Sequence, residues 1–168
     1  MADRAQMRKI ISILVRNKPG VLSHVAGLVT RRAYNVESIA AGPTEDNSIT
    51  RITLVVSGDE QVLEQVTKQF RKLIDVIKVD DIPHELAMTG ELALITVAFD
   101  PSRKSEIMNL VNVLGMSVQS IGLDSITLQV AGSAQRVDTA INGLYPFEIR
   151  AMARTGLVAL PVTPAGAQ

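Results

Sequence analysis

One local feature limits the possible folds of this chain more than any other. A nearly continuous run of β-branched and other large apolar residues at 10–15 is followed at once by the turn Arg-Asn-Lys-Pro-Gly at 16–20. The run predicts a strand in the middle of a sheet, and no regular element can cross the turn. Apolar residues then recur at helical spacing up to about Arg32. We therefore expect a strand, a tight loop and a helix, in that order.

The rest of the first half completes a βαββαβ order. Residues 36–41 and 51–56 are expected to be strands joined by a turn-rich connection. A second helix is expected to begin at the acidic segment 57–60, because negative charge is favourable at a helix N-terminus. A fourth strand at 76–80 closes the unit, which we place at residues 7–81.

The same order of elements returns in the second half, without clear identity between the halves. We expect a linker at residues 82–90, a second βαββαβ domain at residues 91–155 and a flexible tail at residues 156–168. In the second domain the segment Asp-Pro-Ser at 100–102 is a helix-capping signal. The predicted fold class is α+β, with two ferredoxin-like βαββαβ domains.

A four-stranded sheet with both helices on one face leaves its other face open. The second domain or a second copy of the chain would have to cover that face, because the strands contain few polar residues. The expected edge strand at 36–41 also has no Lys or Pro to discourage pairing with another edge. We expect at least a homodimer.

Composition excludes several classes of function. The 168 residues include no Cys, and 17 basic residues balance 17 acidic ones. Disulfides, iron–sulfur clusters and thiolate zinc sites are therefore excluded, and the absence of a basic bias argues against nucleic-acid binding. No stretch approaches the length of a membrane span and no signal-peptide pattern is found, so we expect a soluble cytoplasmic protein that does not bind membranes.

The sequence offers no catalytic constellation. His24 and His84 are not at metal-ligand spacing. The chain has no phosphate-binding loop, dinucleotide fingerprint or nucleophile elbow. We predict no catalysis by this chain and no metal site.

The turn before the first helix is the best candidate for a binding site. The unpaired amides at the start of a helix bind anions such as a carboxylate. Gly20 lets a ligand approach the backbone, Pro19 stiffens the loop, and Asn17 adds a side-chain amide. Val21 and Leu22 are predicted to form an apolar wall for the side chain of a bound amino acid. A simple structural turn is the alternative, since strand-Pro-Gly-helix turns are common.

The residues around this turn resemble a known family. They read Asn-Lys-Pro-Gly-Val-Leu at 17–22, Arg-Arg-Ala-Tyr-Asn-Val-Glu-Ser at 31–38 and Gly-Pro-Thr-Glu-Asp at 42–46, with further matching segments at 57–65, 72–76 and 91–95. The first segment is typical of any ACT domain, a ligand-sensing βαββαβ module. Together, over residues 7 to about 158, they resemble the small regulatory subunit of acetolactate synthase, also called acetohydroxyacid synthase.

The resemblance implies a non-catalytic subunit in branched-chain amino acid biosynthesis, the route to valine and isoleucine. It implies activation of a large catalytic subunit and feedback inhibition by valine. Thiamine diphosphate, Mg and FAD are expected on that large subunit, and no cofactor is expected on this chain. It also implies that residues 7–81 form an ACT domain that pairs with a second copy and holds the effector at the interface.

By matching position, the effector site consists of two groups of residues. The first loop supplies Asn17, Lys18, Pro19, Gly20, Val21 and Leu22, while Asn35, with Val36 beside it, reaches across from the partner subunit. Two alternatives stay open. One is a stand-alone amino-acid sensor or co-regulator, for which the chain lacks a helix-turn-helix. The other is a small ferredoxin-like enzyme such as an acylphosphatase, for which residues 16–18 are a poor phosphate loop.

Overall fold

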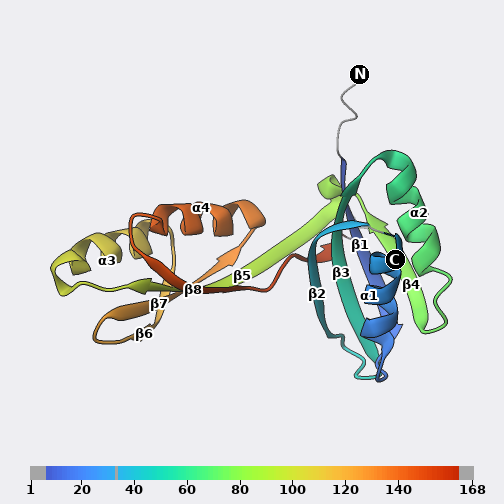
Figure 1. The fold of residues 1–168 in the computed structure, drawn as a ribbon, viewed down its shortest axis with the longest axis horizontal. Coiled ribbons are helices and arrows are strands. Elements are labelled where there is room, and N and C mark those ends of the chain that lie inside the picture. The colour runs from blue at the N-terminus through green and yellow to red at the C-terminus, as the bar shows by residue number, and fades with distance from the viewer. Residues whose placement is uncertain (1–6, 33, 163–168) are drawn as a thin grey trace, which may run out of the picture. The chain divides into compact units, whose positions relative to one another are not determined.

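The chain divides into two compact units (Figure 1). The computed structural model describes residues 7–32 and 34–162. The first unit comprises residues up to Met88 together with those from Leu157 onward, and the second runs from Thr89 to Gly156.

The first unit has the predicted βαββαβ order. Its elements are β1 Met7–Arg16, α1 Val21–Arg32, β2 Asn35–Pro43, β3 Ile49–Gly58, α2 Glu60–Phe70 and β4 Val76–Ile82. The strands form an antiparallel sheet in the order β2-β3-β1-β4. The apolar run that opened the sequence argument therefore lies in a central strand, with β2 and β4 at the two edges.

Alternation along the central strands builds the main core of this unit. Ile11 and Ile13 on β1 and Leu54 on β3 are fully buried in one cluster with Val25 of α1 and Phe70 of α2. Side chains of alternate residues on a strand point to opposite faces, so this cluster defines the helix-covered face of the sheet. Helices α1 and α2 pack on this face of the sheet through apolar side chains.

The other face of the first sheet is covered by a segment that the sequence analysis assigned to a flexible tail. Residues Val158–Pro161 form strand β9, which contacts β1 and pairs with β5 (Ala87–Ala98). Leu157 and Ala159 are buried, as are the helix-distal side chains Ile10 and Val55. The expectation of a flexible tail is therefore wrong for residues 158–161, because apolar residues alternate there and find an apolar face. Residues 163–168 of that expected tail lie outside the described residues.

The expected linker at residues 82–90 is also largely regular structure. β4 extends to Ile82, a short 3₁₀ turn spans His84–Leu86, and β5 begins at Ala87. Pro83 ends β4 because it lacks a backbone N–H, while the following residues pair with β9. The division between the two units falls at Met88, within the range that the sequence indicated.

The second unit repeats the topology. Its elements are β5, the 3₁₀ turn Pro101–Arg103, α3 Lys104–Val113, β6 Ser117–Ile121, β7 Ser125–Gly132, α4 Ala134–Leu144 and β8 Ile149–Arg154, with sheet order β6-β7-β5-β8. Its core is a separate cluster that includes Ile95, Leu128 and Leu144. Arg154 forms ion pairs with the buried Glu91 and with Asp138 of α4. In the described residues no helix has the length and apolar character needed to cross a membrane.

The burial of β9 predicts that the substitution Ala159→Asp destabilises the first unit. Ala159 is 3% exposed, and an unpaired carboxylate there would cost at least about 2 kcal/mol of unfolding free energy. Leu160→Asp is the matched control, because Leu160 lies on the outward side of the same strand and is half exposed. Urea unfolding followed by circular dichroism measures both. Equal stability of the two variants would contradict the proposed cover of the sheet.

Candidate functional site

The predicted turn at the end of β1 has the geometry of an open helix start. Gly20 has a φ of 88°, a left-handed conformation that favours glycine, and a Cβ added there would meet nothing within 4 Å. The Lys18 amide donates to the Arg16 carbonyl at 2.9 Å, which tightens the turn. The Gly20 carbonyl then accepts from the His24 amide at 3.1 Å, so Gly20 is the N-terminal cap of α1.

The starts of α2 and α4 are closed by a side chain. Asp59 accepts from the Val62 amide at the start of α2, and Ser133 accepts from the Arg136 amide at the start of α4. In the second unit the turn equivalent to 17–20 contains Asp100, whose Oδ1 accepts from the Ser102 amide at 2.8 Å. At α1 the corresponding residue is Gly20, and the first turn of the helix has no acidic residue. The Val21 amide reaches the Lys18 carbonyl only at 3.4 Å, and among the described residues no side chain accepts from the first amides of α1. These amides are therefore placed to donate to an external carboxylate.

A neighbouring hairpin holds the turn in place. The Asn17 backbone amide donates to the Ser48 carbonyl at 2.7 Å, and Asn17 Nδ2 donates to the Asn47 carbonyl at 3.0 Å. Asp46 Oδ1 in turn accepts from the Ser48 hydroxyl at 2.7 Å and from its amide at 2.8 Å, and these bonds hold the pKa of Asp46 below its ordinary value. The Asn17 amide group is thus committed to structure, and its Oδ1 is the atom that can accept from a ligand.

The two residues predicted as an apolar wall point in different directions. Val21 is 4% exposed and belongs to the core between the sheet and the helices, so its role as a wall is wrong. Leu22 is 51% exposed, so its role as a wall stays a prediction. Lys18 and Pro19 are exposed on the turn. The helical periodicity of α1 decides the difference, because Val21 is in line with the buried Val25 and Leu28.

The residues predicted to act from a partner subunit lie far from the turn within one chain. Asn35 begins β2 opposite Ser57 of β3, while the turn lies beside Ser48, just before the other end of β3. At about 3.3 Å per residue, β3 separates the two sites by roughly 25 Å. Asn35 Nδ2 donates to the Ser57 hydroxyl at 2.6 Å, and Val36 packs partly buried against the core. One chain alone does not bring the two groups together.

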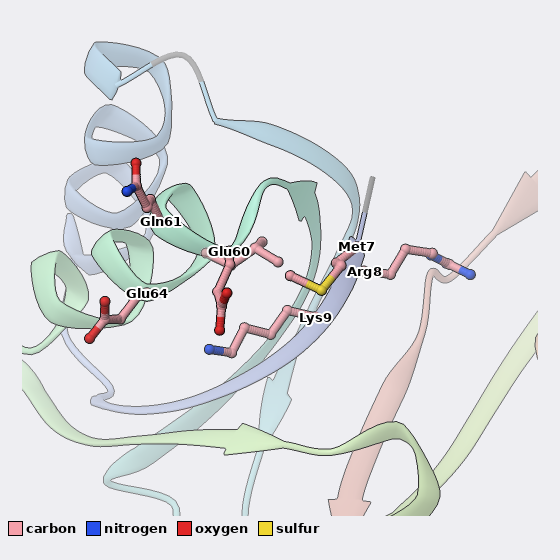
Figure 2. Close-up of a pocket in the computed structure, with 7 residues that line it drawn as sticks. Met7, Arg8, Lys9, Glu60, Gln61 and Glu64 are labelled. Carbon is pink, nitrogen blue, oxygen red and sulfur yellow. The ribbon is translucent and has the colours of Figure 1, made fainter. Parts of the chain in front are cut away.

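A hollow that the sequence analysis missed lies at the other end of β1 from the turn. It has a volume of about 680 Å³ and is lined by the first residues of β1 and of α2, among them Lys9, Glu60 and Glu64 (Figure 2). Lys9 pairs with Asp81 at 2.5 Å, and Glu64 pairs with Lys68 at 2.7 Å. The hydrogen bond from Lys68, with its charge, lowers the pKa of Glu64. None of the predicted site residues lies here, and no sequence signal links segments about 50 residues apart.

The described residues contain no group of three or more side chains that could hold a metal ion. His24 lies on the exposed surface, with Nδ1 3.8 Å from the Asp75 carboxylate.

The fold and the open turn define a class: α+β proteins with two ferredoxin-like units, the first of which is built as an ACT domain. Residues 11–78 match the family model described as the AHAS small subunit-like ACT domain, and residues 90–162 match the model for the small subunit of acetolactate synthase. The chain belongs to the acetolactate synthase small subunit family.

Individual relatives agree with that assignment. The chain is 42% identical to the probable acetolactate synthase small subunit of Archaeoglobus fulgidus, over 92% of this chain and 96% of that protein. It is 43% identical to the acetolactate synthase small subunit of Bacillus subtilis, over 91% and 90% of the two chains. The crystal structure of the Thermotoga maritima small subunit superposes with a TM-score of 0.86 at 36% identity, covering 92% of this chain and 97% of that one.

Proposed function

We propose that this chain is the non-catalytic regulatory subunit of an acetolactate synthase and makes the enzyme sensitive to valine. In this proposal the chain raises the activity of a large catalytic subunit, on which thiamine diphosphate, Mg²⁺ and FAD are bound, and works with it in the cytoplasm. The family assignment supports a large catalytic subunit as the partner of this chain. The uncapped start of α1 supports an effector that has a carboxylate. That open helix start is the observation on which the effector site depends.

The effector is proposed to bind between two copies of the chain. β2 is an edge strand of the first sheet. When the β2 strands of two copies pair antiparallel, the β2 strand of one copy runs in the opposite direction to that of the other. The Asn35 end of one copy would then lie beside residues 17–22 of the other. In this arrangement the α1 amides hold the carboxylate of valine, Asn17 Oδ1 accepts from its ammonium group, and Leu22 contacts its side chain.

Inhibition then follows from a difference between two states of the complex. A ligand held between two copies stabilises the arrangement that binds it best. Valine lowers activity because that arrangement engages the large subunit differently from the ligand-free one, and the same coupling makes the large subunit alter valine affinity. A stand-alone sensor would bind valine without any change in the activity of a second protein.

The direct test is an acetolactate synthase assay of the purified large subunit with and without this chain. We expect the chain to raise activity at least about fivefold, the lower end of typical coupling between sites, and valine to reverse the increase. The chain alone should show no turnover. If the activity of the large subunit is unchanged at saturating amounts of this chain, the proposal is wrong.

The helix start is tested by Gly20→Asp. Its carboxylate would occupy the α1 amides and repel that of valine, so half-inhibition should need at least about tenfold more valine, or about 1.4 kcal/mol. Gly20→Asn is the matched control, because Asn has the same size, tolerates a positive φ and is uncharged. We expect the Asn variant to keep measurable inhibition. Full valine sensitivity of the Asp variant would show that the effector binds elsewhere.

The cross-chain contact is tested by Asn35→Ala, measured as valine affinity by calorimetry. Loss of one hydrogen bond to a charged ligand predicts about tenfold weaker binding. The substitution also removes the Asn35–Ser57 bond, so Ser57→Ala is the control that loses this bond and keeps the Asn35 amide. We expect Ser57→Ala to bind valine nearly as the unsubstituted chain does. If both variants lose affinity equally, Asn35 has only a structural role.

A further inference from the structure

One peptide group between β2 and β3 has a hydrogen-bond partner at each of its ends. Its N–H belongs to Ser48 and donates to Asp46 Oδ1 at 2.8 Å, while its C=O belongs to Asn47 and accepts from Asn17 Nδ2 at 3.0 Å. The peptide is trans, so its N–H and C=O point in opposite directions within one rigid plane. Asp46 and Asn17 therefore hold the two ends of a single planar group, which we call the 47–48 peptide.

Asp46 is itself held in the orientation that this contact needs. Its Oδ1 also accepts from the Ser48 hydroxyl at 2.7 Å. The Thr44 hydroxyl accepts from the Asp46 amide at 3.1 Å and donates to the Asp46 carbonyl at 3.0 Å. A hydrogen bond to a carboxylate is stronger than one between neutral groups and polarises the donor peptide, so the Asn47 carbonyl becomes a better acceptor for Asn17.

The orientation of the Asn17 side chain depends on the 47–48 peptide. The side chain is exposed, so packing does not fix its rotamer. A carbonyl can only accept, which requires Nδ2 to face Asn47 and leaves Oδ1 for a ligand. A side chain that is fixed before the ligand arrives loses less conformational entropy on binding, so the ligand binds more tightly.

The second unit shows which part of this arrangement belongs to the fold. Ala98 is paired with Ser125 as Arg16 is paired with Ile49, and the Phe99 amide donates to the Asp124 carbonyl at 2.9 Å. This backbone bond is equivalent to the one from Asn17 to Ser48. Phe99 has no side-chain amide, however, and the helix that follows it is preceded by a capped turn. The side-chain link to the 47–48 peptide therefore accompanies the open helix start and is not a requirement of the topology.

We propose that Asp46 is a positioning residue for the effector: through the 47–48 peptide it holds Asn17 with Oδ1 ready to accept from the ammonium group of a bound amino acid. This inference rests on the proposed function, since it concerns the same effector turn. Asp46 does not touch the effector in this arrangement. It raises affinity because Asn17 is already ordered when the effector binds.

The test measures valine affinity of the full-length chain by calorimetry. Asp46→Ala removes the acceptor and should weaken valine binding about threefold to tenfold, the range expected for ordering one side chain on binding. Asp46→Asn should restore affinity to within about twofold of the unsubstituted chain, because its Oδ1 can still accept from the Ser48 amide. Asp124→Ala is the matched control, since it removes an Asp and its ion pair with Arg150 from the equivalent connection of the second unit. It should bind valine as the unsubstituted chain does.

A double variant shows whether Asp46 acts through Asn17. If it does, Asn17→Ala combined with Asp46→Ala should bind valine as weakly as Asn17→Ala alone, because the two effects are not independent. A further loss in the double variant would overturn the inference, since Asp46 would then contact the effector or support the turn by another route. So would full affinity of Asp46→Ala or of Asn17→Ala, or an Asp46→Asn variant as weak as Asp46→Ala. An unsubstituted chain that binds no valine would instead contradict the proposed function itself.

Discussion

The structure of the first unit depends on the burial of β1 on both of its faces. This strand pairs with β3 and β4 at its edges, α1 and α2 cover one face through residues such as Ile11 and Ile13, and β9 covers the other above Ile10. A strand enclosed in this way cannot shift its register, because a slip of one residue would exchange the two apolar faces. The turn after β1 therefore lies at a fixed place beside the hairpin at residues 43–49.

The helix starts of this chain show how a binding position can be left open in an otherwise satisfied structure. Side chains of Asp59, Asp100 and Ser133 occupy the amides at three starts, while Gly20 offers none to α1. A capping side chain would stabilise α1 by about 1 kcal/mol. In the proposed function, the chain forgoes that stabilisation so that an effector carboxylate can take the place of the cap.

The surfaces of the first unit are available for different contacts. The helix face is closed by the core, the β2 edge is open for a second copy, and β9 covers the side opposite the helices. In the proposed mechanism, effector binding at the paired edges changes how two copies are arranged, and the catalytic subunit responds to that arrangement. The coupling would then need no deformation inside either sheet, which is consistent with their densely packed cores.

The sequence by itself determined the order of elements, the two ferredoxin-like units and the open conformation of the turn. Each of these follows from local rules: the β-branched run at 10–15, the Pro-Gly pair that ends it, and a glycine where φ is positive. Only the tertiary structure decided that Val21 is buried, that the Asn17 amide is bonded to Asn47, and that residues 158–161 are a strand. These outcomes depend on which distant segment packs against a given residue, and neither spacing nor composition along the chain contains that information.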